Sequence, residues 1–168
     1  MKQLALLIAM LTAPVVGQAE LAFDVQDPAF RVSIPNLPAM EMGSHPMRSA
    51  SPHLRLLGRE GPYTVSLLLP TADAGMTAMD CANATVGSLP RRPGVPAADS
   101  IYRARLDANT FLAIYVTPMP GFAQMHAHLM SAAGGTHCVE VHASMTSRSR
   151  DDLDPWIKGF TAARIEAR

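Results

Sequence analysis

The sequence has no excess charge of either sign and, beyond its first twenty residues, no long apolar run. Its 14 Lys and Arg residues balance 14 Asp and Glu residues over 168 positions. Nucleic acids and anionic lipids are bound through clustered Lys and Arg, so balanced charge without a basic stripe argues against both as partners. A membrane-spanning helix needs about 20 consecutive apolar residues. We therefore expect no membrane span in the mature chain.

The sequence also lacks the common catalytic signatures. It has no Gly-x-Ser-x-Gly elbow, His-Glu-x-x-His motif, Gly-rich phosphate loop or Cys-x-x-Cys pair. A thiol hydrolase that combines a cysteine with His142 would need a free, activated thiolate. Asp151, Asp152 and Asp154 cluster at the start of a predicted helix, where acidic residues favour the helix dipole. The sequence predicts a protein without enzymatic activity and leaves a hydrolase with an unrecognised site as an alternative.

The first nineteen residues have the three parts of a signal peptide. Lys2 gives a positive start, Leu4 to Leu11 form a short apolar run, and Gly17-Gln18-Ala19 places small residues before Glu20. This pattern is typical of an export signal that is cleaved from the mature protein. We therefore expect residues 1–19 to be a signal peptide, residues 20–168 to form one globular domain, and the protein to be periplasmic or secreted.

The two cysteines, Cys81 and Cys138, are predicted to form a disulfide bond. Exported proteins fold in oxidising surroundings, where an even pair of cysteines is most simply paired. The alternative role, a reactive thiol, has no supporting motif in the sequence.

Alternating apolar and polar residues, bounded by Gly, Pro, Asn and Asp, predict short strands joined by hairpins. The predicted strands cover residues 30–34, 53–57, 63–69, 101–106, 111–117, 123–130 and 137–145. Because hairpins join neighbouring strands, we expect a mainly antiparallel sheet of seven or eight strands.

Two segments have helical spacing instead. Met76, Met79 and Val86 follow it in a segment of about 73–88, which predicts a central helix with Thr71 or Asp73 as N-cap. A second helix is predicted over about 155–167, after an Asp-Pro start and along an amphipathic stripe. The stripe consists of Leu153, Trp156, Ile157, Phe160 and Ile165. Helices with such stripes must pack on the sheet, so the predicted fold class is α+β.

The order of these elements resembles the PsbP/Mog1 type of α/β/α sandwich. The residues that carry the resemblance are the opening Phe-x-Val-x-Ile-Pro strand at 30–35 and the closing helix at 156–160. Domains of this type are mostly binding or accessory modules without enzymatic activity. The resemblance therefore implies a class of role and transfers no site residue.

The last predicted hairpin carries the densest group of chemically interesting side chains. His126 and His128 are two residues apart on its first strand, and Glu140 and His142 are two apart on its second. Residues at i and i+2 share one face of a strand. If the two faces coincide, we expect the four side chains to bind copper or zinc, with Glu140 as a ligand or as a support for a ligand.

The pairing register of this hairpin decides whether the faces coincide. A connection with an odd number of residues pairs Ala127 with Val141, and so sets His128 opposite Glu140 and His126 opposite His142. An even connection sets the histidines opposite valines. Apolar matching favours the odd connection, because a one-residue slip mixes the core and solvent faces.

A second copper site is suggested by Met42, His45 and Met47, because thioether and imidazole ligands suit copper. The first interpretation of function is nevertheless an exported binding or accessory protein that acts through a protein partner in the cell envelope, for example an immunity or inhibitor protein. The proline-bordered loops at 42–52 and 89–99 are candidates for its contact surface. A periplasmic copper or zinc binding protein is the alternative.

Overall fold

The computed structural model describes residues 19–44, 51–149 and 151–168, so the predicted signal peptide lies outside it up to residue 18. Two α-helices and ten strands make up the described part. The strands are β1 (Glu20–Gln26), β2 (Ala29–Pro35), β3 (Gly43–Ser44), β4 (Leu54–Glu60), β5 (Tyr63–Leu68), β6 (Tyr102–Arg105), β7 (Phe111–Met119), β8 (Phe122–Ala133), β9 (His137–Ser147) and β10 (Arg164–Ala167). The helical segments are α1 (Ala78–Ser88), α2 (Leu153–Thr161) and the 3₁₀ turns η1 (Leu89–Arg91) and η2 (Ala98–Ser100).

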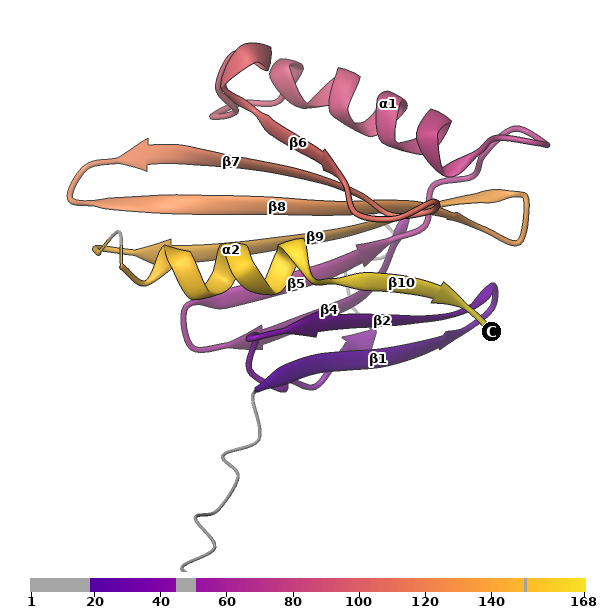
Figure 1. Ribbon diagram of the computed structural model, residues 1–168, viewed down its shortest axis with the longest axis horizontal. Coiled ribbons are helices and arrows are strands. Elements are labelled where there is room, and N and C mark those ends of the chain that lie inside the picture. The colour runs from indigo at the N-terminus through magenta and orange to yellow at the C-terminus, as the bar shows by residue number, and fades with distance from the viewer. Residues whose placement is uncertain (1–18, 45–50, 150) are drawn as a thin grey trace, which may run out of the picture.

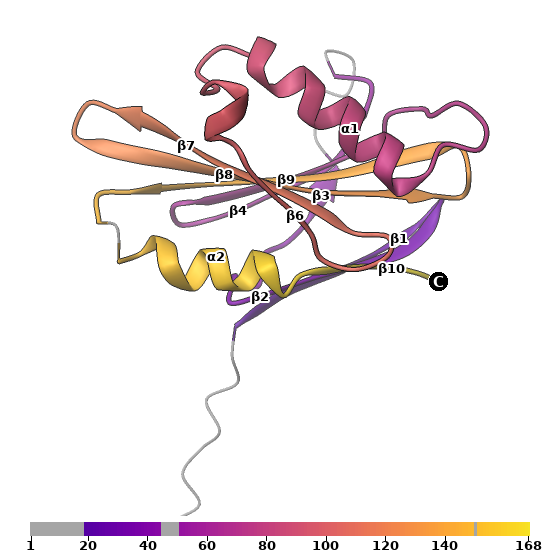
Figure 2. The same cartoon turned by 45° about the horizontal axis from the view of Figure 1, so that its top comes forward.

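The strands form two sheets. A seven-stranded antiparallel sheet has the order β3-β4-β5-β9-β8-β7-β6, and a three-stranded antiparallel sheet has the order β1-β2-β10. Helix α1 covers one face of the large sheet, whereas α2 and the small sheet lie on the opposite side (Figures 1 and 2). The α+β class and the mainly antiparallel sheet are thus confirmed. The large sheet has seven strands, which agrees with the predicted number, but the predicted strand at 30–34 does not belong to it. That segment is part of β2, which pairs with β1 and β10 in the second sheet.

Side-chain alternation along the large sheet builds two apolar layers. On the side of the small sheet, Leu129 and Val141 pack in a core with Phe30, Trp156 and Phe160. On the side of α1, a smaller cluster joins the helix to β7 and β8. Its buried members are Ala78, Ala82, Val86, Leu89, Ile101, Phe111, Ala113, Tyr115 and Met130. Both faces of the central strands are therefore covered over part of their length.

Helix α1 begins five residues later than the start of the predicted segment. Thr77 is the N-cap: its hydroxyl accepts from the Asp80 backbone N–H at 3.2 Å, and the Asp80 carboxylate accepts from the Thr77 N–H at 2.9 Å. These two reciprocal bonds form a capping box, which satisfies backbone donors that the helix leaves free. The predicted N-caps Thr71 and Asp73 are therefore wrong.

The predicted C-terminal helix is also too long. Helix α2 ends at Thr161, and Arg164–Ala167 continue as strand β10, in which Ile165 pairs with Val32 of β2. Ile165 is buried in this strand as it would have been in the helix, so its apolar character fits both structures. Pairing with β2 gives the last residues backbone partners that an exposed last helical turn would lack. No helix among the described residues is long and apolar enough to cross a membrane.

The predicted disulfide bond is present between Cys81 in the first turn of α1 and Cys138 at the start of β9. Both residues are buried. The bond fixes the end of α1 to the central strand of the large sheet and so determines which part of that face the helix covers.

We predict that replacing both cysteines, as in Cys81→Ala with Cys138→Ala, lowers the free energy of unfolding. The cross-link closes a loop of 57 residues, and the chain-entropy model gives about 3–4 kcal/mol for loops of this length. Urea unfolding of the two proteins measures the difference. A loss below about 1 kcal/mol would show that the bond adds little to the fold.

A second prediction compares two helix glycines. A Cβ at Gly159 in α2 would collide with the backbone carbonyl oxygen of Pro35, whereas a Cβ at Gly87 in α1 meets nothing within 4 Å. Gly159→Ala should therefore destabilise the protein by about 2 kcal/mol or more, because backbone must move. Gly87→Ala should stabilise it by about 0.5–1 kcal/mol, because alanine favours the helix. Equal thermal shifts in the two variants would contradict the packing of α2 on β2.

Candidate functional site

The pairing of β8 with β9 brings the predicted site residues to one face of the large sheet. Three residues, Gly134 to Thr136, connect the two strands, as an odd connection requires. Gly134 and Gly135 have positive φ values of +61° and +70°, which residues with a Cβ rarely adopt. The parity of the predicted register is therefore correct.

The pairing itself differs from the predicted one by two residues. His128 lies directly opposite His142, while Glu140 lies opposite Met130 and His126 opposite Ser144. The predicted pairs of His128 with Glu140 and of His126 with His142 become diagonal neighbours. All four side chains still share one face, because a two-residue shift leaves the faces unchanged.

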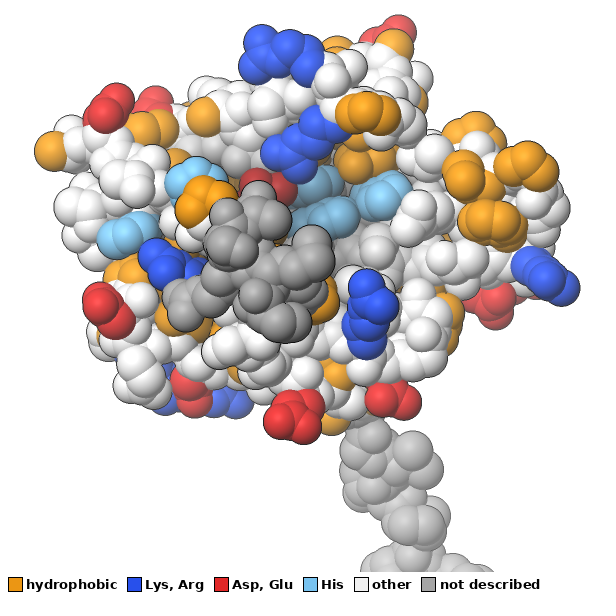
Figure 3. Space-filling view, turned by 180° about the vertical axis from the view of Figure 1, so that it is seen from behind, with side chains coloured by type: hydrophobic (Ala, Val, Ile, Leu, Met, Phe, Trp, Pro, Cys, Tyr) orange, Lys and Arg blue, Asp and Glu red, His pale blue; other side chains and the backbone are white. Residues whose placement is uncertain are grey.

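The three imidazoles are in direct contact. His128 and His142 have ring centroids 4.4 Å apart with planes at 15°, and His126 and His142 have centroids 5.3 Å apart with planes at 9°. His126 Nδ1 and His142 Nε2 lie 3.1 Å apart and share a hydrogen bond, in which one neutral ring donates to the other. Figure 3 shows imidazole side chains, in pale blue, gathered in a hollow of this face beside a basic side chain.

His126, His128 and His142 form a histidine cluster. A carboxylate and a guanidinium lie beside it. The Nδ1–H of His128 donates to Glu140 Oε1 at 2.8 Å, and Arg92, which follows η1, approaches the same oxygen to 3.6 Å. Tyr115 of β7 stacks on His126 at a centroid distance of 4.7 Å. Neither Tyr115 nor Arg92 was predicted from the sequence, because only the β7–β8 pairing and the path of the loop after α1 bring them here.

Burial determines the charge of the cluster. Desolvation, followed by the electrostatic effect of His128, lowers the pKa of His126 to about 4. The same two causes, with a further contribution from His126, lower the pKa of His142 to about 3. Burial opposes ionisation of Glu140, but the hydrogen bond and charge of His128 and the charge of Arg92 outweigh it and lower the pKa of that carboxyl. At neutral pH the cluster therefore has two neutral imidazoles beside a paired carboxylate.

One fully buried polar atom of the cluster has no partner among the described residues. His128 is fully buried, and its Nε2 makes no hydrogen bond among the described residues. An unpaired buried polar group costs about 1–3 kcal/mol, so native structures contain few of them. The free Nε2 is therefore a feature of His128 that folding alone does not explain.

The structure brings all four predicted metal ligands together. Their side chains form two hydrogen-bonded pairs, His126 with His142 and His128 with Glu140. Among the described residues no group of three or more His, Cys, Asp or Glu side chains is placed to hold a metal ion. Of the second suggested site, His45 and Met47 lie outside the described residues, and Met42 packs partly against the main core. Copper or zinc binding thus stays a prediction.

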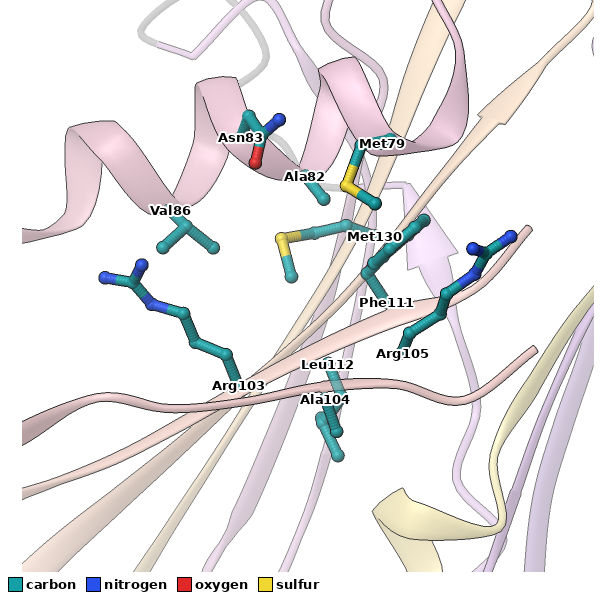
Figure 4. Close-up of a pocket in the computed structure, with 10 residues that line it drawn as sticks. All are labelled: Met79, Ala82, Asn83, Val86, Arg103, Ala104, Arg105, Phe111, Leu112 and Met130. Carbon is teal, nitrogen blue, oxygen red and sulfur yellow. The ribbon is translucent and has the colours of Figure 1, made fainter. Parts of the chain in front are cut away.

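A small apolar pocket lies between α1 and the outer strands of the large sheet. Met79 and Val86 of the helix border it from one side and Met130 and Phe111 from the other (Figure 4). Its volume is about 230 Å³, below the roughly 300–1,000 Å³ of most ligand pockets. Guanidinium groups at its rim already donate to backbone carbonyls. We interpret the pocket as a packing gap between helix and sheet.

The end of the β7–β8 hairpin is an exposed apolar surface. Val116, Met119 and Phe122 are 40%, 42% and 37% exposed, and Pro118 and Pro120 lie between them. The hairpin end projects beyond the other elements of the sheet (Figure 1), and hydrophobic side chains gather over it in Figure 3. We call these five residues the hairpin tip. The connection between the strands predicted at 111–117 and 123–130 was not singled out from the sequence.

Comparison with known proteins adds no assignment. No protein-family model matches the chain, and no curated protein matches it in sequence. The resemblance to the PsbP/Mog1 type accordingly stays a prediction.

We predict that acid weakens the fold through the histidine cluster. The folded pKa values of about 4 for His126 and about 3 for His142 lie below the ordinary 6.5, so the unfolded chain takes up protons first as the pH falls. Stability is then constant above about pH 6.5 and falls below it, by up to about 1.4 kcal/mol per pH unit for each histidine. The lowered pKa of Glu140 adds a further loss only below its ordinary value of 4.5.

Urea unfolding between pH 6.5 and 5, with a chelator present, isolates the histidine effect. His142→Gln should reduce the pH slope by roughly half, because one of the two shifted groups is removed. His53→Gln, an exposed position outside the cluster, should keep the slope of the unmodified protein. An unchanged slope in His142→Gln would show that His142 is not buried in its neutral form.

Proposed function

We propose that the protein is an exported, non-enzymatic binding protein that acts through a protein partner in the periplasm or outside the cell. An immunity or inhibitor protein is one concrete form, and an accessory subunit of an envelope complex is another. The observation that carries the proposal is the hairpin tip, three large exposed apolar side chains on a projecting hairpin. The export part of the proposal depends on the signal peptide predicted at residues 1–19.

The chemistry of the tip favours a folded protein with an apolar recess as the partner. Apolar side chains that fill a recess in a partner and are fully desolvated there supply most of the binding energy of an interface. Pro118 and Pro120 have no backbone N–H to offer to an added strand, which disfavours β-strand addition at this end. Both residues also restrict the backbone, so the tip loses little conformational entropy on binding.

A polar rim adjoins the tip. A groove of about 550 Å³ runs between Phe122 and the segment that leads to α2, and it is lined by Ser147, Arg148 and Ser149. Polar groups around an apolar centre are the usual arrangement of protein interfaces. Because the whole chain has no net charge, we expect the partner to be recognised by shape and apolar contact more than by long-range attraction.

The histidine cluster supports the non-enzymatic part of the proposal. A nucleophile needs a base within hydrogen-bond reach, and the hydrogen bonds of the cluster histidines run to one another and to Glu140. The two cysteines are bonded to each other, which removes the thiol that a cysteine hydrolase would use. The described residues therefore offer no activated nucleophile beside the imidazoles.

Site-directed photo-crosslinking tests the proposal. A photo-reactive amino acid replaces Met119 or Phe122 in the exported protein, and the chain is irradiated in its own compartment. We expect one defined adduct from both positions. The matched control position is Met79, which is 43% exposed in the first turn of α1; it should give no such adduct.

Binding to the partner identified in the adduct then decides the role of the tip. Met119→Ser with Phe122→Ser should weaken binding at least tenfold, whereas Met79→Ser should leave it unchanged. Adducts that form equally at all three positions, or an adduct with a second copy of this chain only, would contradict a specific partner that docks on the tip.

A further inference from the structure

His128 combines two features that are rare together in a folded protein. Its Nδ1–H donates to Glu140 Oε1 at 2.8 Å, and its Nε2 is buried without a partner among the described residues. A carboxylate that accepts from one ring nitrogen fixes the orientation of an imidazole and raises the basicity of the other nitrogen. Histidines that bind metal ions almost always have such an outer partner.

Two more imidazole nitrogens lie beside this ring. His142 stacks on His128, and its Nε2 lies 3.1 Å from Nδ1 of His126. Two nitrogens that bind one zinc ion at about 2.0–2.1 Å lie roughly 3.3 Å apart in a tetrahedral arrangement. The pair is therefore close enough together to reach one ion, although the two nitrogens now face each other in a hydrogen bond.

We propose that His126, His128 and His142 bind one Zn²⁺ or Cu²⁺ ion, with Glu140 orienting His128 and not contacting the ion. This inference goes beyond the proposed partner binding and does not depend on it. Imidazole suits both ions, and three histidines leave a fourth coordination position open.

The described side chains are not now placed to hold an ion, so ion binding requires a local rearrangement. The nitrogens of His126 and His142 now face each other in a hydrogen bond, so the rings must turn until both lone pairs converge on one point. His128 Nε2 then supplies the third nitrogen and gains the partner that it lacks. Metal binding displaces any proton on a ligating nitrogen, which is usual for histidine ligands.

The surrounding charges define the role of Glu140. Its carboxylate is 6% exposed and pairs with both His128 and Arg92. Arg92 is 45% exposed, so solvent screens its positive charge. The ion therefore meets imidazoles and a carboxylate whose charge is partly compensated, which fits neutral nitrogen ligands better than direct carboxylate binding.

Calorimetric titration of the oxidised, full chain with Zn²⁺ alone, and separately with Cu²⁺ alone, tests the site. We expect one ion per chain for at least one of the two metals. His126→Ala and His142→Ala should each weaken binding at least a hundredfold. Glu140→Gln keeps the shape of the side chain but removes its charge, and it should weaken binding roughly 10–100-fold.

His53→Ala is the matched control, because His53 is exposed and lies outside the cluster; its affinity should equal that of the unmodified protein. The ¹⁵N shifts of the three cluster histidines provide a readout without mutation. On adding Zn²⁺, Nε2 of His128, Nε2 of His142 and Nδ1 of His126 should move to metal-bound values.

Absence of binding by the unmodified chain, or an equal loss in His53→Ala and His142→Ala, would overturn the proposal. So would zinc-dependent shifts confined to histidines outside the cluster. The partner experiment has a separate outcome, because Met119→Ser with Phe122→Ser should leave metal affinity unchanged. Failure of one proposal therefore does not imply failure of the other.

Discussion

The antiparallel pairing of β8 with β9 is the constraint on which the rest of the structure depends. These two strands lie at the centre of the large sheet, with β7 and β5 as their outer neighbours. One face of the pair, with Leu129 opposite Val141, forms the main apolar core. The other face carries His128 opposite His142, and Cys138 of β9 fixes α1 beside them. A single pairing thus determines the core, the site of the helix and the histidine cluster.

Burial of polar side chains on this face requires compensation, and the structure supplies most of it within the cluster. Glu140 pairs with His128 and Arg92, and His126 and His142 share one hydrogen bond. Among the fully buried side-chain atoms of the cluster that the structure describes, only the Nε2 of His128 lacks a partner. Polar networks of this kind stabilise a fold when every member is bonded and weaken it when one is not. A bound ion would supply the partner that this nitrogen lacks. The hairpin tip is a separate surface with its own proposed role.

The sequence predicted those features that one residue pattern determines. The alternation of apolar and polar residues predicted most strands of the large sheet and the shared face of the four site residues. The oxidising compartment expected for an exported protein predicted the disulfide bond. Other features depend on competition between distant segments. Ile165 fits an amphipathic helix as well as a strand, and pairing with Val32 decided between them. Apolar matching restricts the β8–β9 register to one parity, but Ala127 is accommodated opposite Ala143 as readily as opposite valine, so the pattern did not exclude a two-residue shift. Arg92 and Tyr115 reach the cluster only through tertiary structure.

The register of β8 and β9 is the central claim, and cross-strand nuclear Overhauser effects measure it most directly. The account predicts backbone contacts between Ala127 and Ala143 and between Leu129 and Val141, as the structure pairs them. Contacts between Ala127 and Val141, with Glu140 opposite His128, would contradict it, because the stacking of His128 on His142 would then be lost.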